Sequence, residues 1–353
     1  MENTGINFAI AGGAVLGFLL GVVLQRSQYC VRAALAQLFR GGDLSQFHAY
    51  LLAMAVAAVG TQGLVAAELI DPSAQPFLRS SVPLPGLLVG ALVFGAGMMA
   101  AGGCPLRLIV RAAEGRLDAM VAWLVFVLTV MATLEGVLAP LREAATRQVI
   151  GLEVVAVPAL LGNLPGWATA LLLAIVVVAV LAATRNRVSA ERRWPMLFAG
   201  LAIGLLAAGA WLVSVAGADP FKPAQPAGLA FVAPAQDLLR FLTMNRLGFE
   251  AKFTSSSVAG VFLGALLTAL IGRRFRWRGA EGNALVGNIL GAAMMGWGGV
   301  LAIGCTFGQG ITGVSTLSLT SLLAVAGFVA GAFAGQRFLT PFFQSSQRVV
   351  PVR

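Results

Sequence analysis

Three cysteines are the residues of this chain whose type and setting could carry chemistry. Cys30, Cys104 and Cys305 each lie in a polar or glycine-rich break between long apolar stretches, in RSQYCVRAAL, GGCPLRLIVRAAEG and IGCTFGQGITGVS. The cysteines are far apart in sequence and form no C-x-x-C pair, which argues against a zinc site and against a disulfide framework. A neutral thiol can still donate a weak S–H hydrogen bond. We therefore expect the breaks, and not a metal, to be where this chain contacts a ligand.

Glycines beside the second and third cysteines predict interrupted helices. Gly103 precedes Cys104 and Gly304 precedes Cys305, while Pro105 suits the first position of a new helix that Cys104 would cap. A half-helix that begins inside a membrane presents free N–H groups and a partial positive charge, which attract an anion. The flanking glycines would let a ligand approach the backbone closely.

These patterns define a set of candidate pathway residues. They are Cys30, Cys104, Cys305, Gly103, Gly304, Thr306, Gln309 and Thr312. The polar members after Cys305 have two interpretations that the sequence leaves open: they satisfy the broken backbone, or they line the path. The cysteines could also be small apolar fillers of a packed interior. We assign no catalytic residue, no metal site and no cofactor.

The elements that must position these residues are membrane helices. The chain has 353 residues, of which 58% are hydrophobic and 11% charged, with a mean hydropathy of +0.87. This composition excludes an ordinary soluble domain and favours one all-α, polytopic membrane domain over residues 1–353. The apolar stretches predict nine spans, at about 7–25, 48–70, 84–103, 119–139, 167–184, 195–216, 257–272, 284–303 and 317–339.

The basic residues orient the predicted spans. With the N-terminus outside, the inside segments hold 17 of the 24 lysines and arginines and the outside segments hold seven. An excess of basic residues in cytoplasmic loops predicts a cytoplasmic-membrane protein with its N-terminus outside and its C-terminus inside. The same bias explains the net charge of +10, so nucleic-acid binding is not expected.

The glycine spacing predicts an internal repeat. Gly90, Gly95, Gly97 and Gly103 precede Cys104 at the offsets at which Gly291, Gly296, Gly298 and Gly304 precede Cys305. By the predicted topology the two stretches run in opposite directions, as in transporters built from inverted repeats. We therefore expect half-repeats at about 1–140 and 195–340. Close helix packing alone also selects small residues, and the second half has no counterpart of Cys30.

Two further polar features have open interpretations. Residues 217–253 form a long outside segment, and AQDLLRFLTMNRLGFEAKF within it has apolar residues at helical spacing. This pattern predicts an amphipathic helix on, or dipping into, the outer surface. Glu135 is an acidic residue near the outer end of a predicted span. Either it is solvated there, which we favour, or it couples proton movement to transport.

The cysteine motifs resemble those of a known family. RSQYCVRAAL, GGCPLRLIVRAAEGRLDA and IGCTFGQGITGVSTLS are similar to the three cysteine motifs of the YeeE/YedE family of membrane proteins, which is associated with sulfur transport and includes thiosulfate transporters. The resemblance implies an hourglass-like helical fold with Cys30, Cys104 and Cys305 along a central path for thiosulfate. It also implies a cytoplasmic sulfur-carrier partner of the TusA type. Proline and arginine after Cys104 depart from many members of the family.

Thiosulfate uptake is the function that the motifs and the resemblance together favour. Thiols can donate to its soft terminal sulfur, and the N–H groups of half-helices can bind its oxygens. The alternatives are a membrane thiol or persulfide relay, disfavoured by the wide cysteine spacing, and transport of a selenium compound. A soft-metal channel is disfavoured because the chain has one histidine and few acidic residues in its spans.

Overall fold

Helices make up almost all of the structure, a computed structural model that describes residues 2–151, 155–160, 162, 164–216, 226–244, 252–279 and 282–344. Within these ranges the strands are β1 (Ser81–Val82) and β2 (Ile150–Gly151), which pair antiparallel. The all-α fold class predicted from composition is confirmed.

Nine helices of the described residues are long and apolar enough to cross a membrane. They are α1 (Glu2–Ser27), α3 (Ser45–Ala66), α4 (Leu84–Ala100), α6 (Leu117–Leu134), α9 (Gly166–Ala183), α10 (Ala190–Val215), α12 (Phe253–Ile271), α13 (Gly282–Leu301) and α14 (Leu319–Phe338). Each coincides with one predicted span to within a few residues, apart from α1 and α10, which begin about five residues earlier, and α6, which ends about five residues earlier. Their outward side chains, such as Ile175 and Phe333, are large and apolar, as a lipid-facing surface requires.

Shorter elements connect or extend these helices. Three of them follow the cysteines, and these are α2 (Val31–Arg40), α5 (Pro105–Ala113) and the π-helical turn η5 (Gly308–Gly313). The others are η1 (Pro72–Ala74), η2 (Pro76–Leu78), α7 (Ala139–Thr146), α8 (Val157–Leu160), η3 (Arg185–Arg187), α11 (Ala233–Met244) and α15 (Thr340–Gln344).

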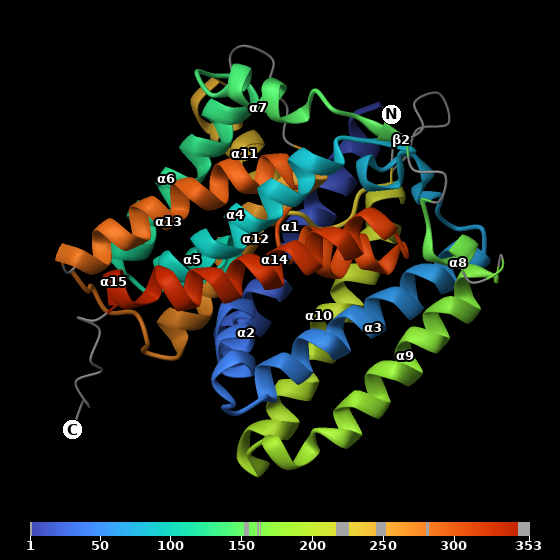
Figure 1. Cartoon of the computed structure of the whole chain (residues 1–353), viewed down its shortest axis with the longest axis horizontal. Helices are drawn as coiled ribbons and strands as arrows, with labels where there is room; N and C mark the ends of the chain where they lie inside the picture. The colour runs from blue at the N-terminus through green and yellow to red at the C-terminus, as the bar shows by residue number, and fades with distance from the viewer. Residues whose placement is uncertain are drawn as a thin grey trace.

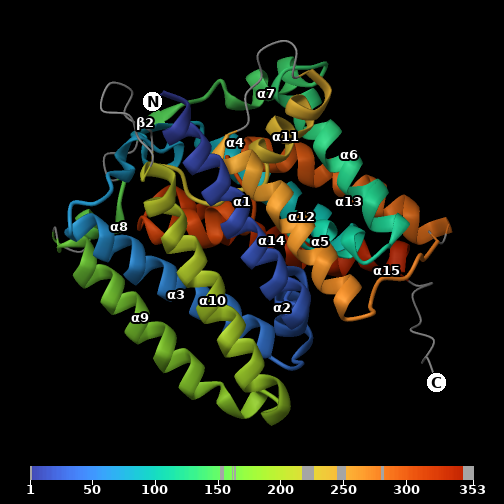
Figure 2. The same ribbon diagram turned by 180° about the vertical axis from the view of Figure 1, so that it is seen from behind.

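The helices pack in a pattern that repeats along the chain. Helix α1 packs on α12 as α10 packs on α3, and α4 packs on α14 as α13 packs on α6. The short α2 packs on α3 and α14, as α11 packs on α12 and α6. Helix α9 stands outside this pattern and lies at the edge of the molecule beside α3 (Figures 1 and 2). The packing of α1–α6 is therefore matched, element by element, in α10–α14.

Four of the eight aligned glycines lie where α4 and α13 cross, whereas Gly95 faces α14 and Gly296 faces α6. A Cβ atom at Gly90 would lie 2.7 Å from the Gly298 carbonyl oxygen, and one at Gly97 would lie 2.7 Å from the Gly291 carbonyl oxygen. The reverse substitutions clash as well, at 2.5 Å for Gly291 and 2.6 Å for Gly298. Backbones this close admit no side chain at these positions. Helix packing, one of the two explanations open from the sequence, accounts for these glycines.

The predicted amphipathic helix is present as α11, while residues 217–225 and 245–251 of that segment lie outside the described residues. Helix α11 packs on α6 and α12, and the stretch before it enters the interior, where Leu229 and Phe231 are buried. Glu135 caps α6 and pairs with Arg240 at 2.5 Å, with its side chain 46% exposed. A paired, half-exposed carboxylate at a helix end fits the solvated interpretation of Glu135.

Candidate functional site

Each cysteine stands at the start of a helix that follows a break. Cys30 is the N-cap of α2, and Cys104 is the N-cap of α5 with Pro105 at the first helical position. The carbonyl oxygen of Cys305 accepts the N–H of Gln309 at 2.8 Å and so begins the turn that leads into η5. The N-cap position predicted for Cys104 is confirmed. All three thiols are free and buried.

The chain reverses in the same way before each cysteine. The residue two positions upstream has a left-handed backbone, with φ of 55° at Gln28, 70° at Gly102 and 57° at Ile303. Glycine adopts this conformation at no steric cost, whereas Gln28 and Ile303 are held in it by their surroundings. The recurrence shows that the three breaks are built alike, although only the second has a glycine at the left-handed position.

Cys30 and Cys104 come together at one cavity. Both residues lie on its wall, at the starts of α2 and α5. The cavity is lined by Leu24, Tyr29, Cys30, Val31, Cys104, Leu106, Arg107, Val110, Thr306 and Phe307. Its volume is about 10 Å³, roughly that of one water probe and too small for a five-atom anion. The structure therefore shows this part of the molecule in a closed conformation.

Cys305 lies next to this cavity and does not line it. The two residues that follow it, Thr306 and Phe307, form part of the cavity wall. The Cys305 sulfur accepts the N–H of Gly308 at 3.4 Å, so this thiol is held in the turn that it begins. Phe231 packs edge-on against Phe307, with 5.3 Å between the ring centroids. The stretch before α11 thus covers Cys305.

Both tyrosines of the chain lie with the cysteines, although neither belongs to the predicted pathway residues. Tyr29 lines the cavity, and Tyr50 donates its hydroxyl to the Thr306 carbonyl oxygen at 2.8 Å. The Tyr50 hydroxyl fills the space that a Cβ atom at Gly310 would need. The position of Tyr29 directly before Cys30 was the one local signal for its role. The bond from Tyr50 to Thr306 joins residues 256 positions apart and has no local signal.

The other predicted polar residues hold the break in place. Gln309 donates its amide N–H to the carbonyl oxygens of Ala302 at 2.9 Å and Ile303 at 3.3 Å, and its own oxygen accepts the Ser321 hydroxyl at 2.6 Å. Thr312 donates to the Leu229 carbonyl oxygen at 2.7 Å. The bonds of Gln309 satisfy carbonyl groups at the end of α13 that the interrupted helix would otherwise leave bare, and the bond of Thr312 ties η5 to the stretch before α11.

The two predicted glycines, Gly103 and Gly304, each lie close to a side chain of the turn that follows. A Cβ atom at Gly103 would lie 3.4 Å from the Cβ of Arg107, and one at Gly304 would lie 3.1 Å from the Cγ of Gln309. Of the eight predicted residues, Cys30, Cys104 and Thr306 line the cavity in this conformation.

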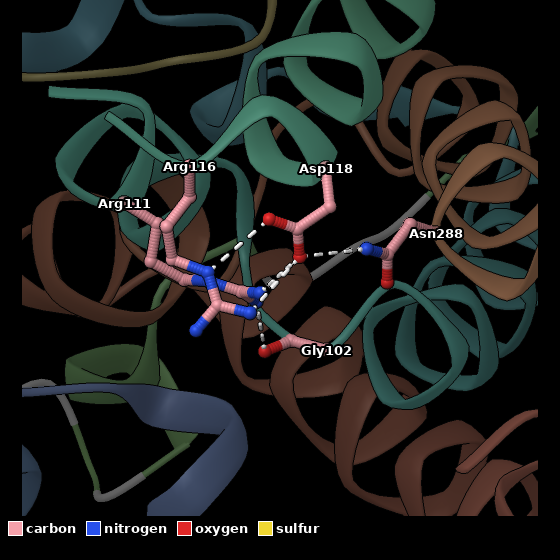
Figure 3. Close-up of polar contacts among 5 residues, drawn as sticks. All are labelled: Gly102, Arg111, Arg116, Asp118 and Asn288. Carbon is pink, nitrogen blue, oxygen red and sulfur yellow. Dashed lines mark hydrogen bonds and ion pairs between the residues drawn. The ribbon is translucent and has the colours of Figure 1, made fainter. Parts of the chain in front are cut away.

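An ion-pair network anchors the break before Cys104 (Figure 3). Arg111 donates to the Gly102 carbonyl oxygen at 3.1 Å and pairs with Asp118 at 2.6 Å. Asp118 also accepts bonds from Arg116 at 3.1 and 3.2 Å and from the Asn288 amide at 3.2 Å. The network joins the end of α4 to α5, to the first turn of α6 and to α13. Arg111 thus donates to a carbonyl group beyond the end of α4, as Gln309 donates to carbonyl groups beyond the end of α13.

A second, basic pocket opens beyond the cavity. Its volume is about 340 Å³, and it is lined by Gln28, Glu114, Arg116, Arg273, Arg274, Arg276 and Arg278; we call it the arginine pocket. Arg107, on the cavity wall, donates to the Gln28 side-chain oxygen at 2.5 Å. Gln28 in turn donates to Glu114 at 2.9 Å. Gln28 therefore stands between the cysteine cavity and the arginine pocket.

Comparison with known proteins adds to this geometry. A family model described as sulphur transport matches residues 26–334, a region that contains all three cysteines. The chain is 27% identical over 347 residues to the thiosulfate transporter TsuA of Escherichia coli (strain K12), covering 92% of this chain and 91% of that protein. It is 27% identical over 332 residues to the thiosulfate transporter TsuA of Spirochaeta thermophila, covering 90% of this chain and 96% of that protein.

Proposed function

The chain belongs to the sulphur transport family, and from this premise we propose that it imports thiosulfate through a path marked by its three cysteines. Such proteins are transporters and not enzymes, and the relatives named above are thiosulfate transporters. The observation that carries the proposal is the cavity at which the starts of α2 and α5 bring the Cys30 and Cys104 thiols together.

The chemistry of the cavity suits a soft dianion. Thiosulfate has a terminal sulfur, which accepts weak S–H donation, and a sulfonate-like oxygen end, which prefers N–H and O–H donors. The N-termini of α2 and α5 add partial positive charge without a bound counter-ion. Several weak contacts let a permeating ion leave as well as enter. The closed cavity has to widen for each passage.

We further propose that two inverted halves, at about 1–140 and 195–340, surround the path. The matched packing of α1–α6 and α10–α14 supports this arrangement, and the odd number of intervening crossings would reverse the second half in the membrane. We also propose that the protein lies in the inner membrane with its N-terminus outside and its C-terminus in the cytoplasm, and the excess of basic residues in the inside segments supports this orientation. In that orientation the arginine pocket faces the cytoplasm.

Uptake of radiolabelled thiosulfate into proteoliposomes of the purified protein tests the proposal. We expect saturable uptake that excess unlabelled thiosulfate suppresses and that empty liposomes lack. Sulfite and selenosulfate as competitors would rank the substrates. Liposomes with the protein that accumulate no more label than empty ones would contradict thiosulfate transport.

A persulfide relay is the second candidate, because the structure brings Cys30 and Cys104 to the wall of one cavity. In such a relay a thiolate would attack the terminal sulfur, the sulfur–sulfur bond of thiosulfate would break, and sulfite would leave. Alkylation during turnover followed by mass spectrometry separates the two functions. Transport predicts unmodified cysteines, whereas a relay predicts a persulfide on one of them.

We also propose a cytoplasmic sulfur-carrier protein of the TusA type as a partner. The exposed basic turns around the arginine pocket are the surface that we assign to this contact. Cells without such a carrier should show reduced sustained uptake, because delivered sulfur is no longer drawn away. An undiminished sustained rate in those cells would show that no such partner is needed.

A further inference from the structure

We propose that Arg107 and Tyr29 form an anion-binding site at the inner end of the cysteine cavity, and that Gln28 holds Arg107 when no anion is there. The inference rests on the proposed transport of an oxygen-bearing sulfur anion, and it adds a charged, specific binding step to a path of neutral thiols. It accounts for buried polar atoms that the fold itself leaves unpaired.

The Tyr29 hydroxyl is the first of these atoms. Tyr29 is 3% exposed and lines the cavity with Cys30 and Cys104. Its hydroxyl is buried and has no hydrogen-bond partner among the residues that the structure describes. A buried hydroxyl without a partner costs free energy, so a ligand that accepts a hydrogen bond from it recovers that cost.

Arg107 supplies the second unpaired atom. It lies in the first turn of α5, three residues after Cys104, and its side chain lines the cavity. One terminal nitrogen, Nη2, donates to Gln28 at 2.5 Å, while Nη1 is buried without a partner in the described part of the chain. A guanidinium presents its donors as a planar fork that matches two oxygens of one anion. Only one arm of that fork is occupied here.

The position of Gln28 allows it to give up its bond to the Arg107 guanidinium when an anion binds there. Its backbone is left-handed, a conformation that costs a non-glycine residue free energy and that persists only where the surroundings enforce it. Its side chain bridges Arg107 and Glu114 at the mouth of the arginine pocket. An anion that occupied both arms of the Arg107 fork would displace Gln28 and open the way into that pocket.

The two ends of thiosulfate fit the two kinds of donor. The terminal sulfur would face the Cys30 and Cys104 thiols, and the oxygens would face Arg107 and the Tyr29 hydroxyl. The five arginines of the next pocket then compete for the anion, so that it is not trapped on Arg107. A neutral solute of the same size would gain no charge attraction from Arg107.

Equilibrium binding of radiolabelled thiosulfate to the purified protein in detergent, beside uptake by proteoliposomes, tests the site. The variants are Arg107→Gln, Arg107→Lys and Tyr29→Phe, and Arg40→Gln on exposed α2 surface is the matched control for loss of one positive charge. We expect Arg107→Gln to weaken binding about tenfold or more and Tyr29→Phe about fivefold. Arg107→Lys should recover part of the loss, and Arg40→Gln should bind as the parent does.

The outcomes separate this inference from the proposed function. A parent protein that binds and transports thiosulfate, with Arg107→Gln and Tyr29→Phe that bind it equally well, would overturn the site and leave the transport proposal intact. A parent protein that neither binds nor transports thiosulfate would overturn both. Melting temperatures identify a variant that fails to fold, and Tyr29→Phe, which keeps the ring and its packing, then decides.

Discussion

The three sulfur atoms differ in their surroundings, and substitutions at them should differ accordingly. Cys30 and Cys104 border the cavity, whereas Cys305 accepts a backbone N–H and is covered by the stretch that contains Phe231. A thiol with an accepting role inside a turn contributes to local structure, while a thiol on a cavity wall is free to donate to a ligand. We therefore expect two classes of cysteine: Cys30 and Cys104, which are free to donate to a ligand, and Cys305, which supports the turn that it begins.

The first prediction concerns Cys104→Ala and Cys104→Ser. Alanine removes the S–H donor, a contact worth on the order of 1 kcal/mol, so thiosulfate uptake should fall severalfold or more with little change in melting temperature. Serine keeps a donor but hardens and shortens it. It should retain more uptake than alanine if donation is what matters, and no more than alanine if softness or covalent chemistry is essential. Alanine variants of all three cysteines with parental uptake would show that the cysteines only pack.

The second prediction concerns the contact between Gly310 and Tyr50. Gly310→Ala would place its Cβ atom where the Tyr50 hydroxyl lies, so the melting temperature should fall and uptake should be lost. Adding Tyr50→Phe removes that oxygen and should restore part of the stability, a coupling that a double-mutant cycle measures. Gly63→Ala is the control, because nothing lies within 4 Å of its added Cβ atom. Strict additivity of the two substitutions would contradict the contact.

At the scale of elements, each interrupted helix needs a side chain that donates hydrogen bonds to the carbonyl groups at its end. Arg111, held by Asp118, does this after α4, and Gln309, held by Ser321, does it after α13. The first pair is charged and the second is neutral. Removing one member of a buried ion pair destabilises a protein strongly, because the other charge is left buried and unpaired. The break at Cys104 should thus be the more sensitive of the two to substitution.

The third prediction is that Asp118→Asn destabilises the protein strongly. The substitution keeps the shape of the side chain but leaves Arg111, 8% exposed, without its counter-charge. Breaking a buried pair in this way costs about 3–5 kcal/mol, so the melting temperature in detergent should drop by many degrees. Glu143→Gln, at the exposed pair with Arg142, is the control and should change it little. Equal effects of the two substitutions would contradict an anchoring role for Asp118.

The same scale shows what local sequence can and cannot predict. The nine spans follow from the length of apolar runs, and the cap at Cys104 follows from the Gly103 and Pro105 beside it; both are local properties. The cover over Cys305 by Phe231 and the bridge from Arg107 to Gln28 join segments that are far apart in sequence. Their side chains meet only because the helices pack as they do, and no pattern along the chain encodes that.

At the scale of the whole molecule, the packing and the charge distribution carry different information. The matched packing of α1–α6 and α10–α14 describes how the helices fit together, and it says nothing of their orientation in a membrane. The distribution of arginines predicts which side of the protein faces the cytoplasm, and this prediction does not depend on the packing. An inverted repeat requires both, since opposite orientation of the halves is a statement about the bilayer.

The last prediction fixes the orientation. Single cysteines introduced at Asn186, in the basic turn η3, and at Ala144, in α7, are both exposed and lie at turns that an odd number of spans separates. An impermeant thiol reagent applied to intact cells should label position 144 and leave position 186 unlabelled until the cells are opened, because the basic turn is expected inside. The parent protein is the control for its own buried cysteines. Labelling at 186 without labelling at 144 would reverse the topology, and the arginine pocket would then face the outside and serve entry of the anion.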